Sequence, residues 1–305
     1  MEKRDSFRFG VWPAVVGVAI LVSVACSGTR AETVDLDVEL RARALVPGEP
    51  VRIVVTSPEA LASFEGTFLG EKIVMVRTGA AGPDGEHWSG WAMVALDQGA
   101  GPTAVEVTGA IADGRVAAGR LDVTVEAKEF PKEELSVASK YVSPPPEVQE
   151  RLKRERAKLR KVYAMRTTTP PPGEPFEKPV PGDPTSIFGT RRIFNGEPRS
   201  PHPGLDLRGG TGEPVAAAGS GTVVIAGDYY YSGNLVIVDH GGGLFTLYAH
   251  LSEIDVEEGQ SVAQGEIVGL VGATGRVTGP HLHWGAKIGN RPFDPMALVD
   301  TELFR

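Results

Sequence analysis

The histidines of this chain are few and lie mostly toward its C-terminal end. The 305 residues contain 6 histidines and 1 cysteine, and every histidine except His87 follows residue 200. A single cysteine excludes a metal site built from several thiolates, so a bound metal must be held by histidine and carboxylate groups. The chemistry to look for is therefore that of imidazoles and carboxylates.

The first candidate segment is His202-Pro203-Gly204-Leu205-Asp206. Pro203 and Gly204 argue against a regular helix. In an extended chain His202 and Asp206 have the same parity and point to the same side. A histidine and a carboxylate on one side can hold two corners of a zinc site.

The second candidate segment is His281-Leu282-His283. In a strand both imidazoles face the same way and Leu282 faces the core. Two such residues lie ~6.5 to 7 Å apart, too far for the backbone alone to bring both onto one ion. One of the two can be a metal ligand while the other acts beside it as an acid or base.

The third candidate, His250, lies in the alternating segment Leu244 to Leu251. A period of two places Thr246, Tyr248 and His250 on one face of a predicted strand. The opposite face is expected to carry Leu247, Ala249 and Leu251. Taken alone, His250 reads as an ordinary strand histidine, and His240 beside Gly241 reads as a hairpin residue that is not a ligand.

These segments together resemble the lysostaphin-like (LytM-type) zinc metallopeptidases. The resemblance covers about residues 185 to 299. Besides the histidine segments it includes a glycine-rich framework, which consists of Phe188-Gly189, Arg191-Arg192-Ile193-Phe194-Asn195-Gly196, Pro214-Val215-Ala216-Ala217, Gly233-Asn234 and Gly272-Ala273-Thr274-Gly275. A β module followed by such a domain also resembles bacterial envelope members of the family. No H-E-x-x-H motif is present, so the helical zincin architecture is excluded.

The resemblance implies that His202, Asp206 and His283 are the zinc ligands. It also places His250 and His281 near the scissile bond, with their division of roles left open. Three protein ligands leave a fourth position for water, and bound zinc lowers the pKa of water to about 7. The implied activity is hydrolysis of peptide bonds in peptidoglycan stems or cross-links, without identifying which bond.

Other functions fit parts of the same sequence. Some members of this family have lost zinc ligands, so the alternative is an inactive envelope regulator that binds peptidoglycan or activates another wall hydrolase. The segment Val256 to Gly269 resembles a biotinyl or lipoyl carrier hairpin, but no lysine lies between Lys178 and Lys287 to be modified. A secreted protease with protein substrates also remains open.

The region 34–127 is predicted to be an immunoglobulin-like β-sandwich, and the whole chain to be mostly β. Turn signals such as Pro47-Gly48 and Asp113-Gly114 separate about seven short runs. The predicted strands are Val34–Leu45, Val51–Thr56, Ser63–Leu69, Lys72–Arg77, Trp88–Val94, Ala104–Ile111 and Leu121–Ala127.

A linker over residues 128–184 is predicted to join this sandwich to a compact β-barrel or sandwich over residues 185–300. A helix is expected from Glu147 to Tyr163, because apolar residues recur at helical spacing and basic residues fill the other face. The Pro-rich segment from Pro170 to Pro184 is expected to be an extended spacer, and the sandwich and peptidase to fold separately.

The first 26 residues resemble an export signal or membrane tether. A basic start precedes an apolar run from Val11 to Ala25 that ends in Ser23-Val24-Ala25-Cys26. Cleavage, lipidation of Cys26 and an uncut anchor all remain open. The chain is therefore expected in the periplasm or cell envelope, and its net charge of −8 argues against a nucleic-acid partner.

Overall fold

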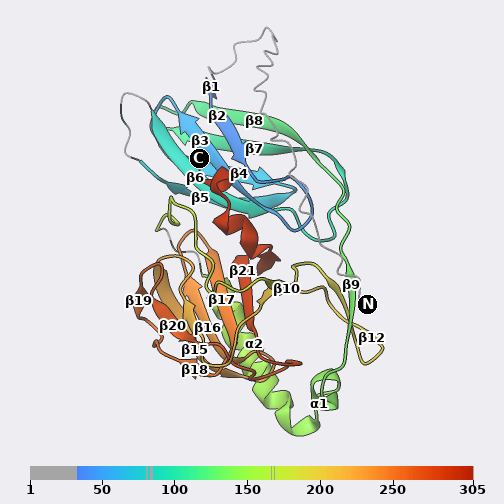
Figure 1. Cartoon of the computed structure of the whole chain (residues 1–305). Helices are drawn as coiled ribbons and strands as arrows, with labels where there is room; N and C mark the ends of the chain where they lie inside the picture. Colours follow the sequence, from blue (N-terminus) through green and yellow to red (C-terminus); the bar gives the residue numbers. More distant parts are fainter. Residues whose placement is uncertain (1–32, 80–81, 83–84, 166, 168, 305) are drawn as a thin grey trace.

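The computed structural model describes residues 33–79, 82, 85–165, 167 and 169–304, and it is built mainly from β-strands. Two β regions lie one above the other, joined by a connecting segment along one side (Figure 1). The expectations about the export signal and Cys26 concern residues outside this described part of the chain. Within the described residues, no helix is long and apolar enough to cross a membrane.

The N-terminal β module contains strands β1 to β8. Their bounds are β1 Val34–Asp35, β2 Asp37–Arg41, β3 Pro50–Ser57, β4 Leu61–Phe68, β5 Glu71–Arg77, β6 Glu86–Met93, β7 Gly101–Ile111 and β8 Val116–Val125. The strands follow the order β1-β8-β7-β4-β5-β6-β3-β2, and β5 pairs with β4 through one half and with β6 through the other. Five of the seven expected strands are present with small shifts at their ends, whereas Val34–Leu45 is divided into β1 and β2 and the strand expected from Leu121 begins at Val116.

One apolar core lies between the two halves of this path. It includes Ile53, Val55, Val105 and Val107, and each of these side chains is at most 1% exposed. Two sheets that share one core form a sandwich, as the alternating pattern predicts. The N-terminal segment that contains β1 and β2 crosses from one sheet to the other, because β1 pairs with β8 and β2 pairs with β3. That the sandwich is of the immunoglobulin type stays a prediction.

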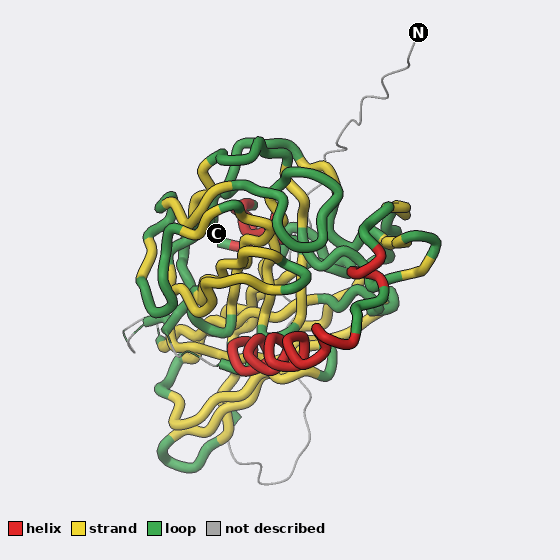
Figure 2. Tube along the Cα trace, turned by 90° about the horizontal axis from the view of Figure 1, so that it is seen from below, coloured by secondary structure: helices red, strands yellow, loops and turns green. Residues whose placement is uncertain are grey.

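The connecting segment contains one short strand and three helices. These are β9 Lys132–Leu135, α1 Ser139–Val142, the 3-10 helix η1 Pro146–Val148 and α2 Gln149–Tyr163. The predicted helix is confirmed as η1 and α2. It lies across one face of the C-terminal sheet (Figure 2), where Val162 and Tyr163 share a core with Ile225 and Phe245.

The C-terminal β domain contains the remaining strands. Their bounds are β10 Pro184–Ser186, β11 Arg191–Phe194, β12 Glu197–Pro198, β13 Leu205–Leu207, β14 Pro214–Ala216, β15 Gly221–Tyr229, β16 Gly233–Asp239, β17 Leu244–Leu251, β18 Glu253–Ile254, β19 Ser261–Val262, β20 Ile267–Leu270, β21 Leu282–Ile288 and β22 Arg291–Phe293. Two 3-10 helices follow, η2 Pro295–Val299 and η3 Thr301–Leu303.

The main sheet of this domain has the order β10-β13-β21-β17-β16-β15-β19, with β22 paired to β21. A small sheet, β14-β20-β18, covers one face, and Val215 and Val268 of this sheet are buried with Val236 and Trp284 of the main sheet. Helix α2 covers part of the other face. The domain is therefore mostly β and compact, with a barrel-like main sheet, as the prediction of a β-barrel or sandwich states.

The predicted face pattern of β17 is wrong at its last two residues, because His250 lies beside His283 on the α2 face and Leu251 lies on the opposite face. Leu247 and Ala249 pack on the α2 face, whereas Leu251 packs with Tyr248 on the opposite face. His250 lies between them with φ +67°, a left-handed conformation, and the register with β16 shifts between Asn234 and Val236. This bulge-like irregularity breaks the alternation, which a pattern of period two cannot anticipate.

The Pro-rich segment is not a free spacer, because it is packed onto the C-terminal domain. Phe176 and Val180 are each 2% exposed and belong to the core of the main sheet. The Phe176 amide donates to the Leu298 carbonyl, and the Glu177 amide donates to the Ala218 carbonyl. The boundary at residue 185 therefore stays a proposal, and this packing favours assigning residues 169–184 to the C-terminal domain.

Replacing Phe176 with alanine should destabilise the C-terminal domain. Loss of a fully buried phenylalanine costs about 3 to 5 kcal/mol of unfolding free energy. Denaturant unfolding of the full chain measures this change. Ile267→Ala is the matched control, because Ile267 is 41% exposed and its replacement should cost much less. Equal midpoints for Phe176→Ala and wild type would mean that the segment is only loosely attached.

The two β regions also touch directly. Trp91 of β6 packs against Phe304 with ring centroids 5.8 Å apart, and Arg43 forms a 2.6 Å ion pair with Asp294. The C-terminal segment η2–η3 lies between the two regions (Figure 1). Whether the two regions fold separately stays a prediction. A fragment that contains only the C-terminal domain would lose the contacts of Phe304 with Trp91 and of Asp294 with Arg43.

Candidate metal centre

Three neighbouring strands, β13, β21 and β17, position Asp206 and His283. In β13, Leu205 and Leu207 are buried in the core, so Asp206 between them points to the other face. Asp206 pairs directly with His283 of β21, and His283 pairs with Ala249 of β17. The alternation that buries leucines on one face therefore brings a carboxylate and an imidazole side by side on the other.

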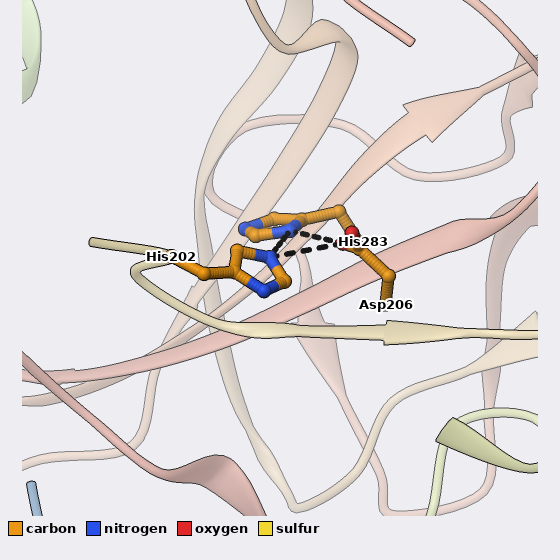
Figure 3. A group of neighbouring side chains, drawn as sticks. All are labelled: His202, Asp206 and His283. Carbon is orange, nitrogen blue, oxygen red and sulfur yellow. Dashed lines mark hydrogen bonds and ion pairs between the residues drawn. The ribbon is translucent and has the colours of Figure 1, made fainter. Parts of the chain in front are cut away.

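His202 completes a cluster with these two residues (Figure 3). His202 Nε2 lies 3.0 Å from His283 Nδ1 and 3.0 Å from Asp206 Oδ1, and His283 Nδ1 lies 2.8 Å from Asp206 Oδ1. Zinc bonds of ~2.0 to 2.2 Å in tetrahedral geometry place ligand atoms about 3.3 Å apart. The three donors are thus arranged as a zinc site requires, with small outward movements.

A backbone carbonyl fixes the orientation of the His202 ring, and Gly204 leaves space for the His283 ring. A carbonyl only accepts hydrogen bonds, so the 3.1 Å contact of His202 Nδ1 with the Ile187 carbonyl places the proton on Nδ1. His202 Nε2 is then left with a free electron pair for a metal. Gly204 lies against the His283 ring, where an added Cβ would come within 2.9 Å of Nε2. The glycine of the first motif is needed for this close approach.

Burial and charge keep His202 and Asp206 in the protonation states that metal binding requires. Burial, with help from His283 and Arg192, lowers the pKa of His202 to about 4, so the ring is neutral at pH 7. Burial would raise the pKa of Asp206, but the close ring nitrogens of His202 and His283 outweigh it and hold that pKa well below its usual value. Neutral imidazole and ionised carboxylate are the forms that bind zinc.

His250 and His281 lie beside this cluster, as predicted from the sequence. The ring of His250 lies 5.0 Å from that of His281 and 5.9 Å from that of His283, between centroids. His250 Nδ1 donates to the Thr274 carbonyl at 2.8 Å, and His281 Nδ1 donates to the Gly279 carbonyl at 2.8 Å. Both rings therefore keep Nε2 free, and His281 Nε2 lies 3.6 Å from Asp206 Oδ1.

This arrangement separates metal binding from proton transfer. A zinc ion held by His202, Asp206 and His283 would supply an activated water and polarise a substrate carbonyl. His250 is neutral, because burial and then the neighbouring His283 and His281 lower its pKa to about 3. The free Nε2 atoms of His250 and His281 can accept a proton or, once protonated, donate a hydrogen bond.

Arg192 is a site residue that reasoning from the sequence missed. Its Nη2 donates to Asp206 Oδ2 at 2.5 Å, on the oxygen that does not face the two histidines. Its Nε is buried, with the Glu133 carboxylate 3.6 Å away. Glu133 lies in β9, which pairs in parallel with β11 and brings it beside Arg192. Arg192 thus orients the carboxylate so that Oδ1 faces the metal position.

Replacing Arg192 with leucine should weaken zinc binding about 10- to 100-fold, the usual cost of losing a residue that orients a metal ligand. Competition with a chromophoric chelator measures the dissociation constant without depending on turnover. Arg191→Leu is the matched control, because the Arg191 side chain is exposed on the same strand. An unchanged zinc affinity in Arg192→Leu would show that Asp206 is held in place without it.

His240 lies outside the site, in agreement with the sequence interpretation. It is 3% exposed and bonds the Ser220 carbonyl through Nδ1 at 2.8 Å and Thr246 Oγ1 through Nε2 at 2.7 Å. Thr246 in turn contacts the Tyr248 hydroxyl at 2.9 Å. This network is in the core on the face opposite α2, so it satisfies buried polar groups and supports β17.

The fold and the site define a class of protein before any comparison is made. Two histidines and one carboxylate, flanked by two further histidines on a β scaffold, are a donor set of the kind found in catalytic zinc centres. Residues 200–295 match the model of peptidase family M23. This part of the chain is a peptidase M23 domain, which confirms the family that the histidine motifs predicted.

Relatives and a solved structure give the same result. The chain is 43% identical over 113 residues to peptidoglycan DD-endopeptidase ShyA of Vibrio cholerae, a match that covers 37% of this chain and 26% of that protein. It is 43% identical over 98 residues to the DD-carboxypeptidase/endopeptidase Mpg of Neisseria meningitidis, which covers 32% of this chain and 23% of that protein. The chain therefore spans about a quarter of the length of these relatives.

The similarity extends beyond the peptidase domain in one crystal structure. A Pseudomonas aeruginosa protein described as a peptidase M23 aligns with a TM-score of 0.62 at 29% sequence identity. The alignment covers 84% of this chain and 95% of that one. The N-terminal β module and the connecting segment are thus part of the shared architecture.

Proposed function

We propose that this protein is a zinc-dependent endopeptidase that hydrolyses peptide bonds in peptidoglycan stems or cross-links. One observation carries the proposal: His202 Nε2, Asp206 Oδ1 and His283 Nδ1 converge within 3.0 Å of one another. His250 and His281 stand beside them with Nε2 free. A metal set with an open position and adjacent acid–base groups supports hydrolysis.

The choice of substrate is supported by the relatives. The Vibrio cholerae and Neisseria meningitidis proteins carry names that state peptidoglycan endopeptidase or DD-carboxypeptidase/endopeptidase activity. Cleavage of wall peptides is the simplest function for the same domain in this chain. An inactive regulator would not need two further histidines whose Nδ1 atoms are held by backbone carbonyls, so the geometry favours the enzyme.

Digestion of purified sacculi by the zinc-loaded protein tests the proposal. The expected products are stem peptides released from cross-links, and their masses identify the bond that is cut. The same incubation after removal of zinc with a chelator should release nothing. If the zinc-loaded protein binds sacculi and releases no peptide, the regulatory alternative is favoured instead.

We further propose export to the periplasm or cell envelope, with a tether through Cys26 or the N-terminal apolar run. Support comes from the sequence alone, in the basic start and the apolar residues up to Ala25. Fractionation of cells that produce wild type and Cys26→Ser tests the tether. Membrane-bound wild type and released Cys26→Ser would support a lipid on Cys26. Two membrane-bound proteins would indicate that the apolar run is the anchor, and two soluble proteins would disprove the tether.

A further inference from the structure

A hollow of about 440 Å³ lies between helix α2 and the β21–β22 hairpin. Its described lining includes Lys153, Arg156 and Arg160 of α2 and Lys287 of β21, with no carboxylate among the residues that line it. We call these four cations and the space between them the basic hollow. Its volume is within the range of small-ligand sites, about 300 to 1,000 Å³.

The basic hollow lies on the same face of the main sheet as the metal centre. The register of β21 with β17 is unbroken from His283 to Ile288, so His283 and Lys287 point to the same side. At ~3.3 Å per residue they are about 13 Å apart along the strand. Gly285 lies between them, and the Leu247 side chain of β17 packs over it. An extended chain of about four residues can span this distance.

The charges of the basic hollow are mostly not neutralised within the protein. Among the described residues, no ion pair neutralises Arg156, Arg160 or Lys287, whereas Lys153 contacts Glu150 at 2.6 Å. The Lys287 amino group lies 4.1 Å from the centroid of the Tyr163 ring, and burial lowers the pKa of this lysine to about 8. Grouped positive charges beside an apolar wall attract an anion and are stabilised by it.

We propose that the basic hollow binds carboxylates of the peptide whose scissile bond lies at the metal centre. This inference rests on the proposed function, because wall peptides carry free carboxylates that a neutral peptide lacks. A lipid surface is a weaker candidate, because Lys287 is recessed between α2 and the sheet, whereas membrane binding favours exposed cations. The hollow thus acts as a substrate-selecting site remote from the chemistry.

Charge reversal on α2 tests this assignment. The variant Arg156→Glu/Arg160→Glu changes two exposed residues and should leave the helix folded. The matched control Arg154→Glu/Lys161→Glu changes the net charge equally at exposed positions of the same helix outside the hollow. Arg156→Lys/Arg160→Lys keeps the charge and should retain binding.

Binding is measured first, in the zinc-loaded full chain carrying His281→Ala so that the peptide is not cut. The probes are a cross-linked wall peptide with free carboxylates and the same peptide with its carboxylates amidated. We expect the free-carboxylate probe to bind about tenfold or more tightly than the amidated one, with an affinity that falls as salt rises. Reversal at Arg156 and Arg160 should abolish this preference, and the control should keep it.

Turnover by the enzyme with His281 intact separates the two proposals. The hollow predicts a raised KM and a kcat changed less than about twofold in Arg156→Glu/Arg160→Glu. Equal binding of both probes would contradict the proposed role of the basic hollow, even if wild type cuts peptides. An equal loss of the carboxylate preference in the control variant would contradict it too. A carboxylate preference without any turnover would support the hollow and refute the proposed activity. If the reversal weakens binding only to vesicles containing anionic lipid, the hollow recognises lipid and our assignment is wrong.

Discussion

Replacing His283 with alanine should remove both zinc and activity. His283 Nδ1 is one of three donors that converge within 3.0 Å, and two donors cannot hold the ion at a comparable affinity. We expect zinc content to fall from about one per chain to near zero. Hydrolysis of sacculi should fall by about 10³-fold or more, because bound zinc contributes several kcal/mol of transition-state stabilisation.

Metal analysis after gel filtration, together with the digest, measures both effects. His87→Ala is the matched control, since it removes an imidazole from the N-terminal β module and should leave zinc and activity unchanged. Asp206→Asn is a second test that keeps the size of the side chain, and circular dichroism verifies folding. A folded His283→Ala protein with full zinc would contradict the ligand assignment.

Replacing His250 or His281 should give a different result, in which zinc stays and turnover is lost. Neither ring belongs to the set of three converging donors, and both hold Nδ1 on a backbone carbonyl. Loss of a residue that transfers a proton or stabilises developing charge lowers kcat by about 10²- to 10⁴-fold. We expect His281→Ala and His250→Asn to fall in this range with zinc near one per chain.

Asparagine is the better substitution at position 250, because it tolerates the left-handed backbone found there at φ +67°. Parallel determination of zinc content, KM and kcat separates lost chemistry from lost metal. Wild-type kcat in either variant would remove that residue from the mechanism. Loss of zinc in either would mean that its ring supports the ligands instead, and the roles of the two histidines would need to be reassigned.

The sequence predicts the orientation of Asp206 and His283 because each lies in a locally encoded alternating pattern, and their role as metal ligands stays a prediction. Asp206 lies between two buried leucines and His283 follows buried Leu282, so alternation alone turns both toward one face. The helix from Glu147 to Tyr163 and most strands of the N-terminal module are also local patterns, and these elements are present with small shifts at their ends. Local periodicity is sufficient wherever one face of an element is buried.

Features that depend on distant contacts could not be predicted in this way. The parallel pairing of β9 with β11 joins two short strands far apart in the chain, and neither has a pattern of its own. Arg192 acquires its role only when that pairing and β13 bring Glu133 and Asp206 to it. The Pro-rich segment has the composition of a spacer, but burial of Phe176 depends on a surface formed by the rest of the domain.

The left-handed backbone of His250 affects which substitutions are favoured at this position during evolution. A residue with a Cβ is less stable by roughly 1 to 2 kcal/mol in this conformation than in the usual ones, whereas glycine adopts it freely. The backbone conformation by itself therefore favours glycine at position 250, and the histidine ring must compensate through its contacts or its chemistry. In a descendant released from peptide hydrolysis, mutation to glycine would gain stability. If His250 takes part in hydrolysis as we propose, the enzyme keeps its histidine at a cost in backbone stability.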